Sequence, residues 1–146
     1  MAAEKQYSDA KQALDLIERE ALPPGKYLTY GRLADLLGYE ASKYARHFGQ
    51  VCSLIDSACY WAKLPMLSLE KIRMDSGGYN PDSFGGIFVG VKSRLIANTA
   101  ARQWSAEDIK RIRQSLTHMN DEGAVAQWRH IESFGQAALD RITSYV

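Results

Sequence analysis

The sequence predicts a mainly α-helical protein with a small β-wing, arranged as a winged helix-turn-helix with an added helical C-terminal region. Apolar residues recur at helical spacing near the start of the chain and through its last third. Between them, two helical patterns are separated only by a tight turn, and glycine-rich turns bound a segment that alternates as strands do. We therefore expect an N-terminal helix over 1–21, a winged-helix domain over 22–92 and a helical extension over 93–146.

The first helix is expected over residues 8–20, where Ser8 is a suitable cap and two prolines after Leu22 end the helix. A short extended segment over 27–29 follows. The helix-turn-helix then consists of a brief helix over 30–37, which Gly38 ends, and a longer helix over about 42–62.

The wing is expected after this longer helix. Residues 67–74 alternate, imperfectly, as a strand would, and Asp75-Ser76-Gly77-Gly78 is a strong turn. Asn80-Pro81-Asp82 and Gly85-Gly86 mark further loop at the tip of the wing. Ile87-Phe88-Val89 is the expected second strand.

The last third begins a helix at Ser105, whose spacing to Asp108 resembles a capping box. Trp104 and Ile109 are placed as a hydrophobic staple across this start. The apolar stripe that follows, with one or two further helices after residue 123, predicts the helical extension. The members of the stripe are Ile109, Ile112, Leu116 and Met119.

Composition limits the function classes. The chain has 146 residues, 46% of them apolar and 24% charged, with a net charge of +1. These values are typical of one globular domain and exclude a polycation, although a local basic face is still compatible with nucleic-acid binding. The first ten residues lack the apolar core of a signal peptide, and no apolar stretch approaches the length of a membrane span. We expect a cytoplasmic protein with no membrane association.

Few residues offer catalytic or metal chemistry. The three histidines are far apart in the sequence, and no HExxH or paired CxxC motif occurs. Cys52 and Cys59 lie seven residues apart on one helix face and are expected to be core thiols. No GxSxG motif or phosphate-binding loop is present. We therefore expect no metal, no cofactor and no catalytic residue in the leading interpretation.

Basic residues gather in and beside the helix-turn-helix. Lys43 and Arg46 are three residues apart on the second helix and are therefore neighbours on one face. Such side chains of a recognition helix are typical of groove and phosphate contacts, although a solvated helix face has the same spacing. The predicted nucleic-acid-binding set is Lys26, Arg32, Lys43, Arg46 and His47.

A family resemblance rests on residues 22–86. Here Pro24-Gly25-Lys26, Leu28-Thr29-Tyr30-Gly31-Arg32-Leu33-Ala34 and Tyr44-Ala45-Arg46-His47-Phe48-Gly49 precede Leu64-Pro65-Met66-Leu67. This order resembles the DNA-binding half of the alkylguanine-DNA alkyltransferases and the alkyltransferase-like proteins. The resemblance implies that Tyr30 packs against the phosphate of a target nucleotide and helps to rotate it out of the duplex. It implies that Arg46 inserts into the base stack, where a planar guanidinium both stacks and donates hydrogen bonds.

The chain departs from this family at the acceptor motif. Leu69-Glu70-Lys71-Ile72 stands where the family has Pro-Cys-His-Arg, so no thiolate is available and alkyl transfer is excluded under this alignment. Glu70 becomes the candidate to face an extruded base, because a carboxylate accepts from an exocyclic amine. Residues 51–63 are an additional helical stretch relative to the family, and residues beyond 86 have no counterpart in it.

Three functional hypotheses follow. The leading one is a protein that binds double-stranded DNA and recognises or flips a modified base without alkyl transfer. The second is a nucleic-acid-modifying enzyme that uses Glu70 or Asp75 as a general base. The third is a protein–protein interaction module in a DNA repair or defence system, with a homodimer or partner contact through the C-terminal helices. Trp104, Ile112 and Leu116 are candidates for that contact together with Trp128, although a staple and a stripe normally pack inward.

Overall fold

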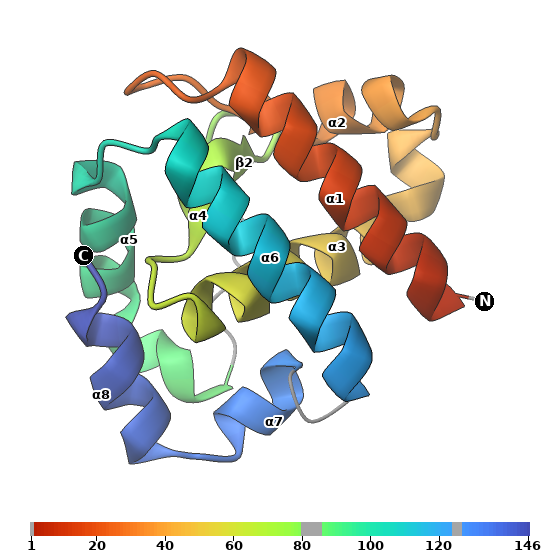
Figure 1. Cartoon of the computed structure of the whole chain (residues 1–146). Coiled ribbons are helices and arrows are strands. Elements are labelled where there is room, and N and C mark those ends of the chain that lie inside the picture. The colour runs from red at the N-terminus through yellow and green to blue at the C-terminus, as the bar shows by residue number, and fades with distance from the viewer. Residues whose placement is uncertain (1, 80–85, 124–126) are drawn as a thin grey trace.

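Helices form most of the regular structure in the computed structural model, which describes residues 2–79, 86–123 and 127–146 (Figure 1). The first half contains α1 (Ala2–Glu20), β1 (Leu28–Thr29), α2 (Tyr30–Leu37), α3 (Ala41–Trp61), α4 (Leu67–Lys71) and β2 (Ile72–Arg73). The second half contains the 3-10 helix η2 (Gly86–Val91), α5 (Lys92–Ala101), α6 (Ala106–Glu122), α7 (Trp128–Glu132) and α8 (Gln136–Ser144). A mainly helical fold with a small sheet is therefore confirmed.

The described sheet consists of two short parallel strands. β1 pairs with β2, with Leu28 opposite Ile72 and Thr29 opposite Arg73. The pairing joins the segment before α2 to the segment after α4 and so closes the helical region between them. It is not the antiparallel hairpin expected of a wing, and the winged part of the fold prediction is not confirmed.

The first wing strand was placed wrongly, because residues 67–71 form α4 and only Ile72 and Arg73 are extended. Every residue of α4 is buried, so the alternation of polar and apolar types does not reflect alternating exposure. Lys71 is only 1% exposed and donates to three backbone carbonyl oxygens of the loop after α1. From the sequence alone, a lysine that is buried with such partners looks the same as a lysine at an exposed position of a strand.

The second wing strand, expected at 87–89, is also wrong, because these residues lie in η2. Phe88 in this turn is buried and packs on Trp128, with ring centroids 4.7 Å apart. The expected loops at Asn80-Pro81-Asp82 and Gly85 lie outside the described residues.

The predicted helices match the structure closely. α1 begins at Ala2, earlier than the expected start at Ser8, whereas α2 and α3 agree with their predicted ranges within a residue. The capping box of α6 is confirmed, since Ser105 Oγ accepts from the backbone nitrogen of Asp108 and Asp108 Oδ2 accepts from that of Ser105, both at 3.2 Å.

Two hydrophobic cores hold these helices together. α1 and α6 run side by side across α3 (Figure 1), and all three contribute with α2 to the first core. The end of α3 joins α4, α5, α7 and α8 in the second core. Trp104, Ile112 and Leu116 are buried in the first core, which confirms their inward packing and contradicts their use as a dimer face. In the described part of the chain, no helix combines the length and apolarity that crossing a membrane requires.

Candidate nucleic-acid interface

α2 and α3 follow one another across a three-residue turn whose ends are set by local contacts. Thr29 Oγ1 accepts from the backbone nitrogen of Arg32 at 3.1 Å and so caps α2. Gly38 ends α2 with φ 82°, a left-handed conformation that glycine adopts without steric cost. α3 is kinked at Tyr44, whose dihedral angles of −117° and 17° are not helical.

The first turns of α3 present two cations to solvent. Lys43 Nζ lies 2.9 Å from Glu40 Oε2, and both side chains are largely exposed. An exposed pair of this kind contributes little free energy, so Lys43 can exchange Glu40 for another anion. Arg46 is exposed and has no hydrogen bond or ion pair to another residue that the structure describes.

His47 turns toward α1 instead. Its Nε2 lies 2.6 Å from Oδ2 of Asp9, which is only 3% exposed. The hydroxyl of Tyr39 donates to the same carboxylate oxygen at 2.8 Å. This carboxylate therefore joins the start of α3 and the turn between α2 and α3 to the middle of α1.

Tyr30 is half-buried at the start of α2, and its hydroxyl lies 3.7 Å from the Sγ of Cys52. Cys52 belongs to the first core. Burial is the main cause that raises the pKa of its thiol to about 12, and the charge of Asp56 is the second cause. The Tyr30 hydroxyl thus faces the protein interior, whereas Arg46 faces solvent.

Glu70 is buried and pairs with Arg73 rather than facing an open pocket. The distance from Arg73 Nη2 to Glu70 Oε2 is 2.9 Å. The Arg73 guanidinium also lies over the rings of Tyr27 and Tyr79, at 4.6 and 4.8 Å from their centroids. Asp75, the alternative general base, accepts from the backbone nitrogen of Gly31 at 2.9 Å. Both carboxylates therefore have structural partners.

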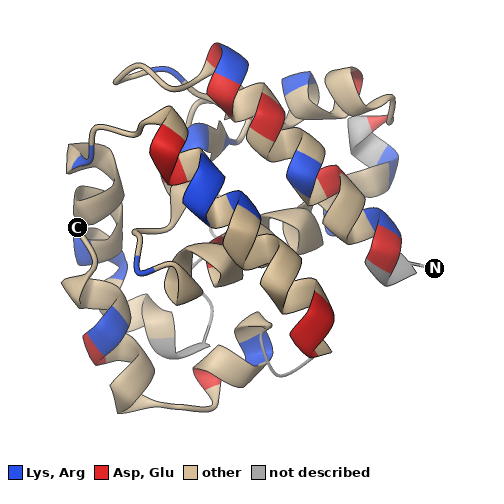
Figure 2. Cartoon of the chain, viewed as in Figure 1, with Lys and Arg blue, Asp and Glu red and all other residues tan. Residues whose placement is uncertain are grey.

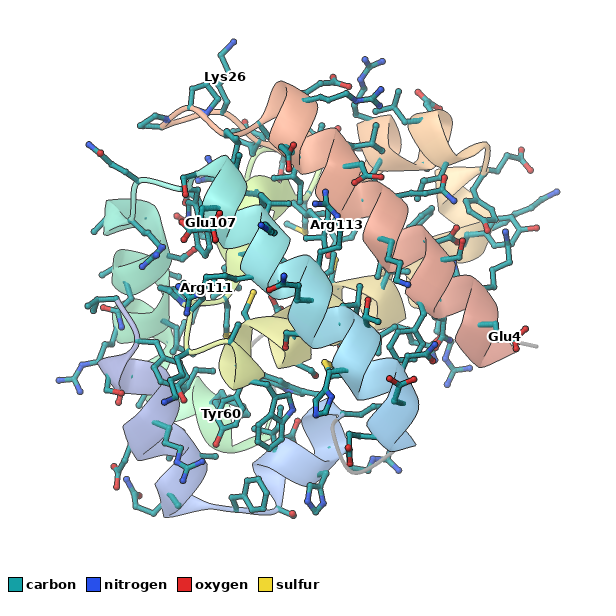
Figure 3. All side chains as sticks on the ribbon, in the orientation of Figure 1. Glu4, Lys26, Tyr60, Glu107, Arg111 and Arg113 are labelled. Carbon is teal, nitrogen blue, oxygen red and sulfur yellow. The ribbon has the colours of Figure 1, made fainter. Side chains whose placement is uncertain are left out.

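The basic residues predicted as one set occupy two separate regions. Arg32 Nη2 lies 3.2 Å from Oε1 of Glu20, the last residue of α1, and Lys26 is on the loop beyond it. Figure 3 shows Lys26 at the opposite end of α1 from Glu4. Asp9, which contacts His47, lies about 16 Å from Glu20 along the axis of α1, since each helical residue adds about 1.5 Å. Lys43, Arg46 and His47 thus lie near the first half of α1.

One cation near this region was not predicted from the sequence. Lys5 of α1 places its Nζ 5.0 Å from the centroid of the Tyr39 ring. A side-chain contact between Gln6 and Gln50 continues the same seam between α1 and α3. The pairs in this seam are more than thirty residues apart in the sequence, so no local spacing reveals them.

The cysteines are free and buried, as the prediction of core thiols requires. Burial is the main cause that raises the pKa of both thiols, which keeps them protonated at neutral pH. Among the described residues, no group of three or more His, Cys, Asp or Glu side chains is arranged to hold a metal ion.

Charge does not concentrate on one element. Both blue and red residues occur along α1 and along α6 in Figure 2. Several cations are already neutralised within the fold, among them Arg113, which lies between α6 and α1 in Figure 3 and pairs with Asp15 at 2.6 Å. Unlike Arg113, Arg46 at the start of α3 has no anionic partner among the described residues.

No protein-family model, curated protein or solved structure matches this chain. The resemblance to the alkyltransferase family therefore stays a prediction from the motif residues.

Proposed function

We propose that this protein binds double-stranded DNA through the first turns of α3. The observation that carries the proposal is the exposure of Lys43 and Arg46, which stand on either side of the kink at Tyr44 in the helix that follows a three-residue turn after α2. Arg46 is exposed with no described anionic partner, and Lys43 has only an exposed one. Phosphate oxygens are the anions that such side chains bind on a duplex.

The proposal is limited to binding. Base flipping, which the family resemblance implies, needs a tyrosine at the phosphate and a group that faces the extruded base. Tyr30 directs its hydroxyl toward Cys52, and Glu70 is buried against Arg73, so neither supports this step. Lys26 and Arg32 lie at the far, C-terminal end of α1 and are proposed as secondary phosphate contacts only.

Fluorescence anisotropy with a labelled duplex, titrated at several salt concentrations, tests the proposal. We expect Arg46→Ala and Lys43→Ala each to weaken binding and to reduce the slope of log affinity against log salt by about one. Lys110→Ala is the matched control, because Lys110 is exposed on α6 and its neighbour Arg111 contacts Ala62, beyond the other end of α3. Unchanged affinity and slope in Arg46→Ala would contradict the proposal.

A further inference from the structure

Four aromatic rings pack together where the turn after α2 meets the start of α3. Tyr39 contacts Tyr44, His47 and Phe48, with ring centroids 4.8, 5.4 and 5.5 Å apart. His47 also contacts Phe48 at 5.7 Å. Phe48 is buried in the first core, whereas Tyr44 is 42% exposed. These rings, named the Tyr44 platform below, therefore connect the interior to an aromatic side chain at the surface.

Hydrogen bonds to a buried carboxylate hold the platform in place. One carboxylate oxygen of Asp9, on α1, accepts a hydrogen bond from the Tyr39 hydroxyl and also contacts His47 Nε2. Two of the rings behind Tyr44 are thus fixed by a group that is itself buried. A ring supported in this way loses less conformational entropy on binding than a free side chain, so its exposed surface is organised in advance for a flat partner.

Three cations lie close to the platform in the fold or in the sequence. Lys5 lies over Tyr39, while Lys43 and Arg46 flank Tyr44 in the sequence and are exposed. A hydrogen bond with Tyr39 and the charge of Asp9 raise the pKa of Lys5 above its ordinary value, so both groups favour the charged ammonium at this position. Glu40 is the acidic neighbour, and its exposed pairing with Lys43 is weak enough to be exchanged for a phosphate.

We propose that Tyr44 stacks on an unpaired base of a DNA strand while Lys5, Lys43 and Arg46 contact the neighbouring phosphates. A supported aromatic ring among cations matches the two chemical parts of a nucleotide, because every base has a flat π-face and every linkage a negative charge. The inference rests on the proposed DNA binding at the start of α3 and adds a preference for DNA that has lost a base pair.

The test compares three labelled probes of one sequence: the intact duplex, the duplex with a single-nucleotide bulge, and the single strand. We expect the wild-type protein to bind the bulged duplex and the single strand more tightly than the intact duplex. Tyr44→Ala should weaken binding to these two probes by roughly 5- to 150-fold, the range for loss of one base–aromatic stack, and leave the intact duplex nearly unaffected. Tyr44→Phe keeps the ring and should retain the preference.

Phe134→Ala is the matched control, because Phe134 is also an exposed aromatic, at 40%, but lies between α7 and α8. It should bind all three probes as the wild type does. A 2-aminopurine base at the bulge supplies a direct readout, since stacking on Tyr44 should quench its fluorescence in the wild type and not in Tyr44→Ala. Unchanged thermal unfolding of Tyr44→Ala excludes misfolding as the cause.

The outcomes separate the two proposals. The stacking role is overturned if binding depends on Arg46 but is equally tight for all three probes. It is also overturned if Tyr44→Ala weakens binding to all three probes equally. Either result leaves the proposed duplex binding intact. Absence of binding to every probe at low salt overturns both.

Discussion

The carboxylate of Asp56 on α3 accepts two hydrogen bonds from Ser68 of α4, at 2.6 Å from the hydroxyl oxygen and 3.2 Å from the backbone nitrogen. Asp56 is buried and joins two helices that the chain connects through the proline-containing segment after α3. Burial raises the pKa of Asp56 to about 7, although both hydrogen bonds from Ser68 act in the opposite direction. The carboxyl group therefore binds a proton more readily in the folded protein than in the unfolded chain.

This difference predicts a stability that depends on pH. Because the pKa of Asp56 rises on folding from 3.8 to about 7, the contribution of this group to the free energy of unfolding should be largest below pH 4. It should fall as the pH rises toward 7, by an amount on the order of a few kcal/mol at most. In Asp56→Asn this decrease should disappear. Urea unfolding at pH 5 and pH 8 measures it, with Asp35→Asn, an exposed carboxylate, as the control.

A second prediction concerns the end of α3. Among the residues that the structure describes, Lys63 is the one non-glycine residue with a positive φ, which is 60°. Its backbone nitrogen donates to the carbonyl oxygen of Tyr60 at 3.1 Å, and that of Leu64 donates to the oxygen of Cys59 at 2.9 Å, which together form a Schellman motif. Glycine adopts this conformation without a steric cost from Cβ. Lys63→Gly should therefore raise the free energy of unfolding by roughly 0.5–1 kcal/mol in urea titrations.

Lys63→Ala separates the backbone effect from the loss of the lysine side chain, because alanine keeps the Cβ atom. It should leave stability unchanged. An equal gain in Lys63→Ala and Lys63→Gly would contradict the argument from φ.

The third prediction concerns the capping box of α6. Ser105→Ala removes the oxygen that accepts from the backbone of Asp108 and should lower the free energy of unfolding by about 1 kcal/mol. Ser105→Thr retains that oxygen and should keep most of the stability in the same urea titration. The arginine contacts of Asp108, at 2.8 and 3.1 Å from Arg102, remain in both variants and limit the loss. Equal destabilisation in the two variants would show that the hydroxyl oxygen is not the cause.

The sequence predicted features whose cause is local. The end of α2 at Gly38, the long helix α3 and the capping of α6 each depend on residues within one or two turns. The strands around residues 67–74 and 87–89 were mistaken because long-range burial decides their structure. Lys71 satisfies carbonyl groups that lie 45 to 49 residues earlier in the chain, and Phe88 packs on Trp128, which follows it by forty positions.

The residues of the candidate interface show the same difference between local and long-range causes. Lys43 and Arg46 were predicted as neighbours from one helical pattern, whereas the structure has a kink between them at Tyr44. The support from Asp9, Tyr39 and Lys5 could not be predicted, since it depends on α1 lying against α3. Tyr30 shows the converse: a motif match specifies a residue type, but the packing of α2 on α3 directs its hydroxyl toward Cys52.

The position of α6 in the first core affects how the protein forms during synthesis. Ile109, Ile112, Leu116 and Met119 complete a core whose earliest member is Tyr7. The helices of the first half therefore emerge from the ribosome before the surface that covers them has been translated. Until residue 119 is added, the apolar faces of α1 and α3 stay partly uncovered, so a nascent chain halted before that point should be a substrate for chaperones.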